Sequence, residues 1–294
     1  MSDSNRPLAW LLLGVLSLIW GSSFILIELG LDSFSGGQVG ALRILAASIF
    51  LSPLAIQKLG NIKRHHWPLL VSVGLLGSLV PSFLFAIAQT NLDSSVTGIL
   101  NALTPLFTVI IGALFFAQKF SQRVKIGLVI GFVGSIILIM TDAGWQIENL
   151  NLYAFLVVFA TTMYGANLNL IKFRIKDLKA LDITSISLLI VGPPAGIYLF
   201  FFTDFVHDLT TVEGAYLSFT YVAVLGIVGT AIALIIFNNL VKISSPIFTS
   251  SVTYIIPVVA VALGVFIEGD ILFIGHYLGM LTIIGGVYLA NRKK

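Results

Sequence analysis

The 294-residue chain is 57% hydrophobic and only 10% charged, and its mean hydropathy is +1.03. A soluble domain carries about 25% charged residues, so the composition excludes a water-soluble enzyme, a disordered chain and a coiled coil. The chain has no cysteine, which excludes disulfides, thiolate metal sites and cysteine nucleophiles. Its apolar runs are continuous and about twenty residues long rather than alternating over about ten, which indicates a helical membrane protein.

The apolar runs predict ten transmembrane helices. The first is too long for a signal peptide and has no small-residue cleavage pattern after it, so we expect it to be retained. In chain order the predicted spans are 8–30, 39–57, 68–88, 95–117, 124–141, 152–172, 183–202, 216–240, 247–267 and 272–290.

The basic residues orient this bundle. If the N-terminus is cytoplasmic and the spans alternate, the cytoplasmic side holds 15 of the 16 Lys and Arg residues, and the sixteenth, Arg43, lies within a span. The outer loops then hold none of them, and a Lys/Arg bias of this kind sets membrane orientation. The sequence therefore predicts a multi-pass protein of the cell (inner) membrane with both termini cytoplasmic.

An internal repeat appears when residues 71–137 are compared with 223–289, an offset of 152. Pro105 then meets Pro257. The matching glycine pairs are Gly74 and Gly226, Gly77 and Gly229, Gly112 and Gly264, Gly127 and Gly279, and Gly134 and Gly286. Five spans is an odd number, so the second copy would enter the membrane from the opposite side. We predict a 5+5 inverted-topology repeat with halves 1–148 and 149–294, an architecture suited to alternating access.

Three short motifs recur in the order and spacing of a known family. They are LIWGSSF at 18–24, ALRILAA at 41–47 and LTPLFT at 103–108. With them the whole chain resembles the EamA family of the drug/metabolite transporter superfamily. The resemblance implies a ten-span carrier that exports amino acids or related compounds.

Two positions depart from the usual pattern of that family. Thirteen residues after the two repeat prolines, where Glu is usual, the chain has Gln118 and Asp270. Eight residues after Trp20, where Lys is frequent, the first copy has Glu28, whereas Lys172 occupies the corresponding place in the second.

Polar and aromatic groups at mid-membrane depth are the candidates for substrate binding. Unpartnered polar groups are costly in hydrocarbon, so these should face the bundle interior. Ser and Thr could instead only bond helices together, and Trp20 and Tyr164 could only fill the core. The candidates are Trp20, Ser23, Ser78, Ser82, Asn101, Tyr164, Asn167, Asn238, Thr253 and Tyr254, with Ser22, Thr104 and Thr230 beside them.

Two further pairs are singled out by position. Pro105 and Pro257 fall within spans, and a proline there removes a backbone donor and kinks a helix, which suggests hinges or gates. Glu28 and Arg43 are predicted to meet as an ion pair at the outer mouth. That pair could clamp the hairpin, or Arg43 could snorkel to the surface; alternatively, Glu28 could take a proton or Arg43 could hold a substrate carboxylate.

The remaining motifs predict little further chemistry. No cofactor, metal site or nucleic-acid partner is expected, and His65 and His66 should be solvated in a basic loop. The small-xxx-small pairs Gly127 with Gly131 and Gly275 with Gly279 favour close helix packing, within a monomer or in a homodimer.

These observations favour a secondary carrier in the lipid bilayer that exports small polar or amphipathic metabolites such as amino acids, with protons as the candidate coupling ion. The alternatives are a passive channel and, less favoured, an intramembrane enzyme, which would need a catalytic His or Asp at depth.

Overall fold

The structure, a computed structural model, describes residues 6–119, 121–142, 144–146, 151–244 and 246–291. These residues form helices joined by turns and loops, with no strand among them. The predicted division between the two halves, at residues 148 and 149, lies outside the described residues.

Each of the ten predicted spans falls on helical structure. In chain order the α-helices are α1 (Arg6–Gly21), α2 (Ser23–Leu31), α3 (Gly36–Lys58), α4 (Trp67–Gly74), α5 (Val80–Ala88), α6 (Ser94–Asn101), α7 (Thr104–Phe115), α8 (Gln122–Asp142), α9 (Tyr153–Arg174), α10 (Ala180–Phe201), α11 (Phe205–Thr211), α12 (Ala215–Gly226), α13 (Ala233–Ile243), α14 (Pro246–Ser250), α15 (Ile256–Leu263) and α16 (Ile274–Asn291).

Shorter helical segments join several of these helices. They are the 3-10 helices η2 (Leu59–Asn61), η3 (Arg64–His66) and η7 (Ser251–Tyr254), and the π-helices η4 (Leu75–Leu79), η6 (Ile227–Ile232) and η8 (Gly264–Glu268).

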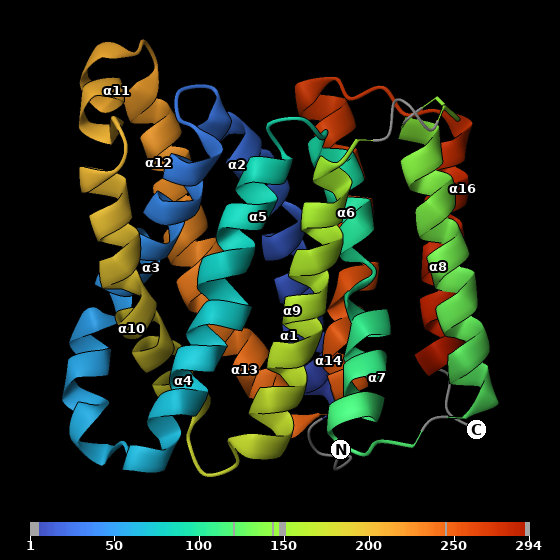
Figure 1. Ribbon diagram of the computed structural model, residues 1–294, viewed down its shortest axis with the longest axis horizontal. Helices are drawn as coiled ribbons and strands as arrows, with labels where there is room; N and C mark the ends of the chain where they lie inside the picture. Colours follow the sequence, from blue (N-terminus) through green and yellow to red (C-terminus); the bar gives the residue numbers. More distant parts are fainter. Residues whose placement is uncertain (1–5, 120, 143, 147–150, 245, 292–294) are drawn as a thin grey trace.

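Among the described residues, eight helical stretches are long and apolar enough to cross a membrane. The last two predicted spans are shorter apolar helices, Ile256–Ile267 and Ile274–Gly286. Figure 1 shows the helices side by side, most of them running between an upper and a lower face, with α8 and α16 together at one edge. The protein is therefore an all-α integral membrane protein, and the short helix α11, which the sequence analysis did not predict, lies on its upper face.

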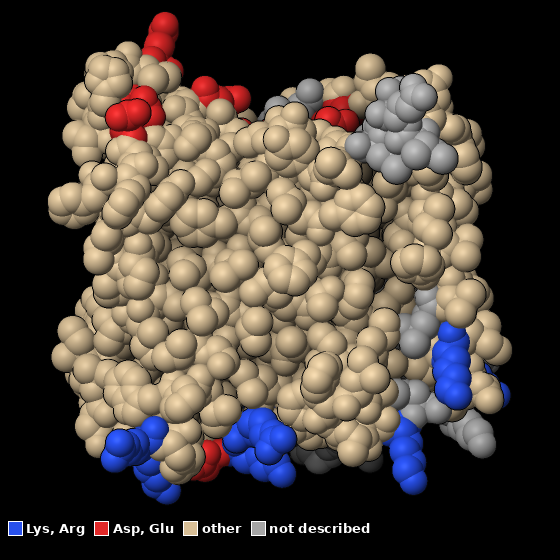
Figure 2. Space-filling model, in the orientation of Figure 1, with Lys and Arg blue, Asp and Glu red and all other residues tan. Residues whose placement is uncertain are grey.

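The two faces differ in charge. In Figure 2 the visible Lys and Arg side chains gather at the lower end, and most of the visible Asp and Glu side chains lie at the upper end. Helix α1 begins and α16 ends at the lower face (Figure 1). On the face shown in Figure 2, a broad belt in which no charged side chain is visible separates the two ends, as expected for a bilayer-spanning surface.

Four of the spans are irregular, and the irregularities match between the two parts of the chain. The third and eighth spans each contain a π-helical turn, η4 and η6, at the 152-residue offset. The fourth span breaks between α6 and α7, and the ninth passes through the 3-10 helix η7. Because π-helical turns and helix breaks expose backbone groups, they are frequent at functional sites.

The repeat prolines are placed differently from the prediction. Pro105 and Pro257 are not interior kinks; they lie in the first turn of α7 and α15, directly after the two breaks. The first-turn amides of a helix have no partner within it, so the missing N–H of proline costs nothing there. The prolines therefore start new helices in mid-span.

Helix contacts are paired in the same way. Helix α6 packs on α15, while α14 packs on α7. Helices α8 and α16 pack on each other at very close range: a Cβ on Gly134 would lie 2.7 Å from the Ile283 nitrogen, and one on Gly286 would lie 2.4 Å from the Gly131 nitrogen. The small-residue faces thus serve packing within one chain, the first of the two predicted uses.

Candidate functional site

A central cavity of about 80 Å³ lies where the irregular spans meet. At roughly 10–15 Å³ for each water centre, it has room for several waters or one small solute. Residues from both parts of the chain line it: Trp20, Ser23, Phe24, Ile27, Arg43, Gly77, Ser78, Ser82, Phe85, Asn101, Thr104, Tyr164, Asn167, Leu168, Gly229, Thr230, Leu234, Phe237, Ser250, Val252 and Thr253.

The helix breaks deliver the polar wall of this cavity. Ser78 lies in η4 and Thr230 in η6, Asn101 ends α6, and Thr253 lies in η7. Each is buried, with at most 6% of its surface exposed. The polar residues of four spans therefore converge because their helices are interrupted at one depth.

Eight of the ten predicted binding residues line the cavity. They are Trp20, Ser23, Ser78, Ser82, Asn101, Tyr164, Asn167 and Thr253. Asn238 lies elsewhere: its amide donates to the Thr184 hydroxyl at 2.8 Å and so bonds α13 to α10. The side chain of Tyr254 lies outside the described residues.

Aromatic side chains form the apolar part of the wall. The rings of Trp20 and Phe237 are 5.0 Å apart, and Phe85 lies 5.8 Å from both Phe24 and Tyr164. Sequence reasoning missed Phe24, Phe85 and Phe237, because an apolar ring in an apolar span carries no signal that separates lining from core. Their spacing to Trp20 and Tyr164 became visible only in three dimensions.

Two hydrogen bonds across the cavity join segments that lie far apart in the sequence. The Trp20 indole donates to the Gly229 carbonyl at 3.0 Å, and the Arg43 Nε donates to the Thr230 hydroxyl at 2.7 Å. Both acceptors lie in η6, where the π-turn changes the backbone hydrogen bonding. Trp20 and Arg43 therefore serve as both wall and cross-link.

The predicted ion pair between Glu28 and Arg43 does not form, since the two residues have different partners. Glu28 accepts a hydrogen bond from the Ser94 backbone at 3.2 Å, whereas Arg43 reaches Thr230. Arg43 follows Gly36, the first residue of α3, by seven positions, and Glu28 precedes the end of α2 at Leu31 by three. At about 1.5 Å per residue the two depths are roughly 10 Å and 5 Å, which the prediction had taken as equal.

Two lysines link α9 and α13 at the lower end, each bonding to the end of the other's helix. Lys172 in α9 donates from Nζ to the Val241 carbonyl at 2.9 Å and to the Ser244 carbonyl, at the end of α13. Lys242 in α13 donates to the Ile175 carbonyl at 2.9 Å, directly after α9. Each cation thus sits at the C-terminus of the other helix, the end whose dipole attracts positive charge.

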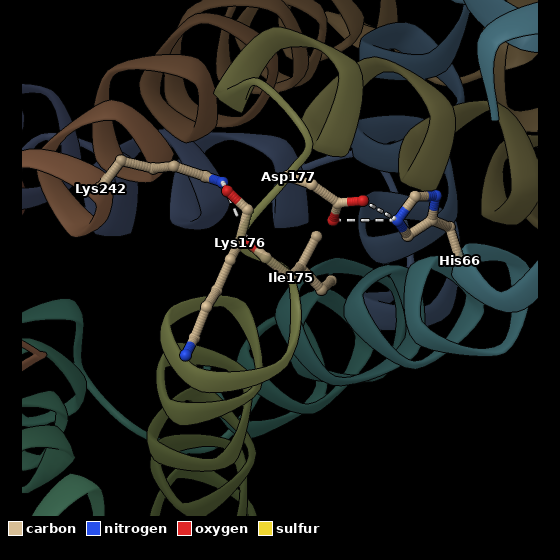
Figure 3. Close-up of polar contacts among 5 residues, drawn as sticks. All are labelled: His66, Ile175, Lys176, Asp177 and Lys242. Atoms are coloured by element: carbon tan, nitrogen blue, oxygen red, sulfur yellow. Dashed lines mark hydrogen bonds and ion pairs between the residues drawn. The ribbon is translucent and has the colours of Figure 1, made fainter. Parts of the chain in front are cut away.

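A histidine adds a further contact beside this exchange. Figure 3 shows the His66 ring pointing at the Asp177 carboxylate, next to the backbone that Lys242 reaches. His66 Nε2 lies 3.0 Å from both carboxylate oxygens, and His66 is only 2% exposed. The hydrogen bond with His66 is the main cause that holds the pKa of Asp177 below its usual value. The expectation of a solvated histidine pair is therefore wrong for His66, although His65 is exposed.

These side chains are also the described group best placed to hold a metal ion. The ligand atoms of His65, His66 and Asp177 lie within 4.8 Å of one another, and the first and last of these residues are exposed. The hydrogen bond between His66 and Asp177 accounts for their approach without an ion.

Two curated proteins to which this chain is similar are named as transporters. The chain is 26% identical over 288 residues to the uncharacterized inner membrane transporter YedA of Escherichia coli K12, covering 95% of this chain and 89% of that protein. It is 23% identical over 160 residues to an uncharacterized transporter of Archaeoglobus fulgidus, covering 53% of this chain and 54% of the relative.

A solved structure has the same fold. Its title is "Crystal structure of protein", it shares 17% identity, and it superposes with a TM-score of 0.68 over 98% of this chain and 97% of its own. The EamA-like transporter family matches the sequence twice, at residues 8–140 and 151–292. These two matches cover nearly the whole chain, and the protein therefore belongs to the EamA-like transporter family and is a membrane transporter.

Proposed function

We propose that the protein is a secondary carrier that moves a small polar or amphipathic metabolite through the central cavity by alternating access. The observation that carries this proposal is the cavity itself: it is lined from both parts of the chain, at the depth where four spans are interrupted. Discontinuous helices at mid-membrane are typical of carrier binding sites. Amino acids are among the solutes that fit a wall of amides, hydroxyls and aromatic rings, and we expect export.

The 5+5 inverted repeat is part of the proposal. Its supports are the two family matches, the π-turns and breaks at matching positions, and the exchanged packing of α6 on α15 and α14 on α7. Two related halves that trade conformations give inward-open and outward-open states of similar energy around one site.

The orientation follows from the charged faces. We place the lower, basic end in the cytoplasm, with both termini on that side, because Lys and Arg gather in cytoplasmic loops. The name of the Escherichia coli relative supports a location in the inner membrane.

Cysteine labelling tests alternating access directly, since the natural chain has no cysteine. Ser78→Cys and Thr253→Cys should react with a membrane-impermeant thiol reagent from each side of the membrane. Ser187→Cys, buried in α10 but outside the cavity, is the matched control and should stay unreactive. A cavity cysteine that is inert from both sides contradicts the proposal.

Counterflow separates this carrier from a channel. Proteoliposomes are loaded with an unlabelled amino acid mixture, and the uptake of labelled amino acids from outside is measured. A carrier takes up the label faster into loaded vesicles than into empty ones. A passive channel shows no such acceleration, and that result would favour the rival function.

A further inference from the structure

The cavity wall carries one charged side chain, and its charge is unbalanced. Arg43 is only 8% exposed, and the described residues that line the cavity include no Asp or Glu. An arginine at membrane depth costs about 2.5–3.5 kcal/mol on insertion scales, so such residues normally face an aqueous path and pair with another group.

Most of the hydrogen-bonding capacity of Arg43 is unused. A guanidinium has five N–H donors, and only the Nε donor has a hydrogen bond among the described residues, to Thr230. Arg43 lines the cavity, and its two terminal nitrogens have no hydrogen bond among the described residues. This edge of the guanidinium presents parallel donors of the kind that bind a carboxylate in two places.

The hydrogen bond to Thr230 orients the guanidinium of Arg43. Thr230 lies in η6, and its hydroxyl donates to the Leu225 carbonyl at 3.2 Å, which fixes the oxygen that receives Arg43 Nε. With Nε held from one side, the guanidinium is oriented, and its two terminal nitrogens are left for a solute in the cavity. Preorganisation of this kind lowers the entropic cost of binding.

The rest of the wall defines what else the solute carries. Trp20 with Phe237, and Phe85 with Tyr164, offer apolar rings to an apolar body. Asn167 also lies on the wall, and its amide oxygen is buried without a hydrogen-bond partner among the described residues.

We propose that Arg43 is the carboxylate anchor of the cavity, so that the transported solutes are amphipathic monocarboxylates, with or without an amino group. The proposal rests on the proposed function, because it places a solute in the same cavity. It assigns to Arg43 selectivity for the anionic group and to the aromatic wall the choice of side chain.

A matched series of ligands tests the anchor on the purified full-length protein. The series is L-leucine, 4-methylpentanoate, L-leucinamide and isopentylamine, which share one apolar body and differ in the carboxylate and the amine. Binding is measured by calorimetry and by the thermal midpoint in detergent. We expect the two carboxylates to bind and to raise the midpoint, and the amide and the amine to bind about tenfold more weakly or worse.

Variants assign this selectivity to Arg43. Arg43→Met should remove the preference for carboxylates, and Arg43→Lys should keep part of it, because a lysine retains the charge but not the two-point geometry. Lys58→Met, which removes a charge from the lower end of the same helix, is the control and should leave the preference intact. If Arg43→Met does not fold, Thr230→Val tests the same point, since it frees the guanidinium without removing it, and should weaken the carboxylates several-fold.

The outcomes are separable from those of the proposed function. Preferential binding of the amine, absence of binding by both carboxylates, or an unchanged preference in Arg43→Lys and Thr230→Val would each overturn the anchor. Thiol labelling of Ser78→Cys from both sides would still support a carrier in those cases, whereas loss of labelling would contradict the carrier itself.

Discussion

Glu28 and Lys172 occupy corresponding positions in the two parts of the chain, yet they carry opposite charges and bind opposite ends of helices. Glu28 lies near the upper end of α2 and accepts from the first backbone N–H of α6. Lys172 lies near the lower end of α9 and donates to the last carbonyls of α13. A carboxylate can only accept and an ammonium can only donate, so the sign of the charge selects the helix terminus.

The comparison extends to the neighbours of each residue. At the upper end Asp270 joins Glu28 at the start of α6, where it accepts from the backbone and the hydroxyl of Ser95. At the lower end Lys242 lies beside Lys172 and donates to the Ile175 carbonyl, at the end of α9. At each end, therefore, side chains matched to the helix dipoles bond helices together, and the two sets of contacts share no residue.

Reversing the charge of Lys172, at the lower end, should have the largest effect on stability. Lys172→Glu places a carboxylate against carbonyl oxygens, which removes the hydrogen bonds and opposes the α13 dipole. We expect a loss of about 2–4 kcal/mol in the free energy of unfolding. The measurement is the thermal midpoint in detergent together with expression. Lys172→Met, which only deletes the contacts, is the control and should cost less; equal losses would mean that charge plays no part.

The opposite charge reversal at the upper end, Glu28→Lys, should have a smaller effect on stability. Glu28→Lys introduces the residue frequent in the family and loses one hydrogen bond, the one from the Ser94 backbone. We expect a change of about 1 kcal/mol or less in the free energy of unfolding. Denaturant titrations of Glu28→Lys and Lys172→Glu side by side give the test. A larger loss for Glu28→Lys would show that the comparison between the two ends fails.

Neutralising the second upper carboxylate sharpens the comparison further. Asp270→Asn keeps an acceptor for Ser95 but loses the charge at the helix N-terminus, at a cost of about 0.3–1 kcal/mol. Accessibility is the more sensitive readout: Ser78→Cys should label faster from the outer side in the Asp270→Asn background. Faster labelling from the lower side instead would contradict a role for Asp270 in the helix contacts at the upper end.

The smallest effect is expected at the contact between the buried His66 and the exposed Asp177. The folded state lowers the pKa of Asp177, so the contact adds stability above the unfolded value of 3.8 and loses it as the pH falls through the folded value. Asp177→Asn should therefore lower the thermal midpoint slightly at pH 6 and match the natural protein well below pH 3.8. A difference that grows on acidification would contradict this sign.

The membrane architecture was predictable because long apolar runs and the Lys/Arg bias act locally and add along the chain. The helix class and the ten helical stretches follow from them, whereas the family was indicated by the order and spacing of three short motifs. Most polar cavity residues were predictable for the same reason, since an Asn or Ser at mid-depth, such as Asn101, must face the interior.

What escaped prediction depends on three-dimensional geometry. Whether Asn238 faces the cavity or bonds to Thr184 is decided by helix rotation, and the partner of Arg43 depends on its depth in α3 relative to Glu28. The exchange between Lys172 and Lys242 uses backbone carbonyls as acceptors, and backbone groups leave no trace in a sequence. Burial of His66 likewise depends on Asp177, which is 111 residues away along the chain.

The paired helices α8 and α16 imply a division of labour within the protein. They meet backbone to backbone through glycine, and no described residue of either helix lines the cavity. Residues on the lipid-facing side of this pair should therefore tolerate substitution without a change in which solute is carried. Differences in substrate choice among relatives would then arise in the other eight spans, while the glycine contacts of this pair serve packing alone.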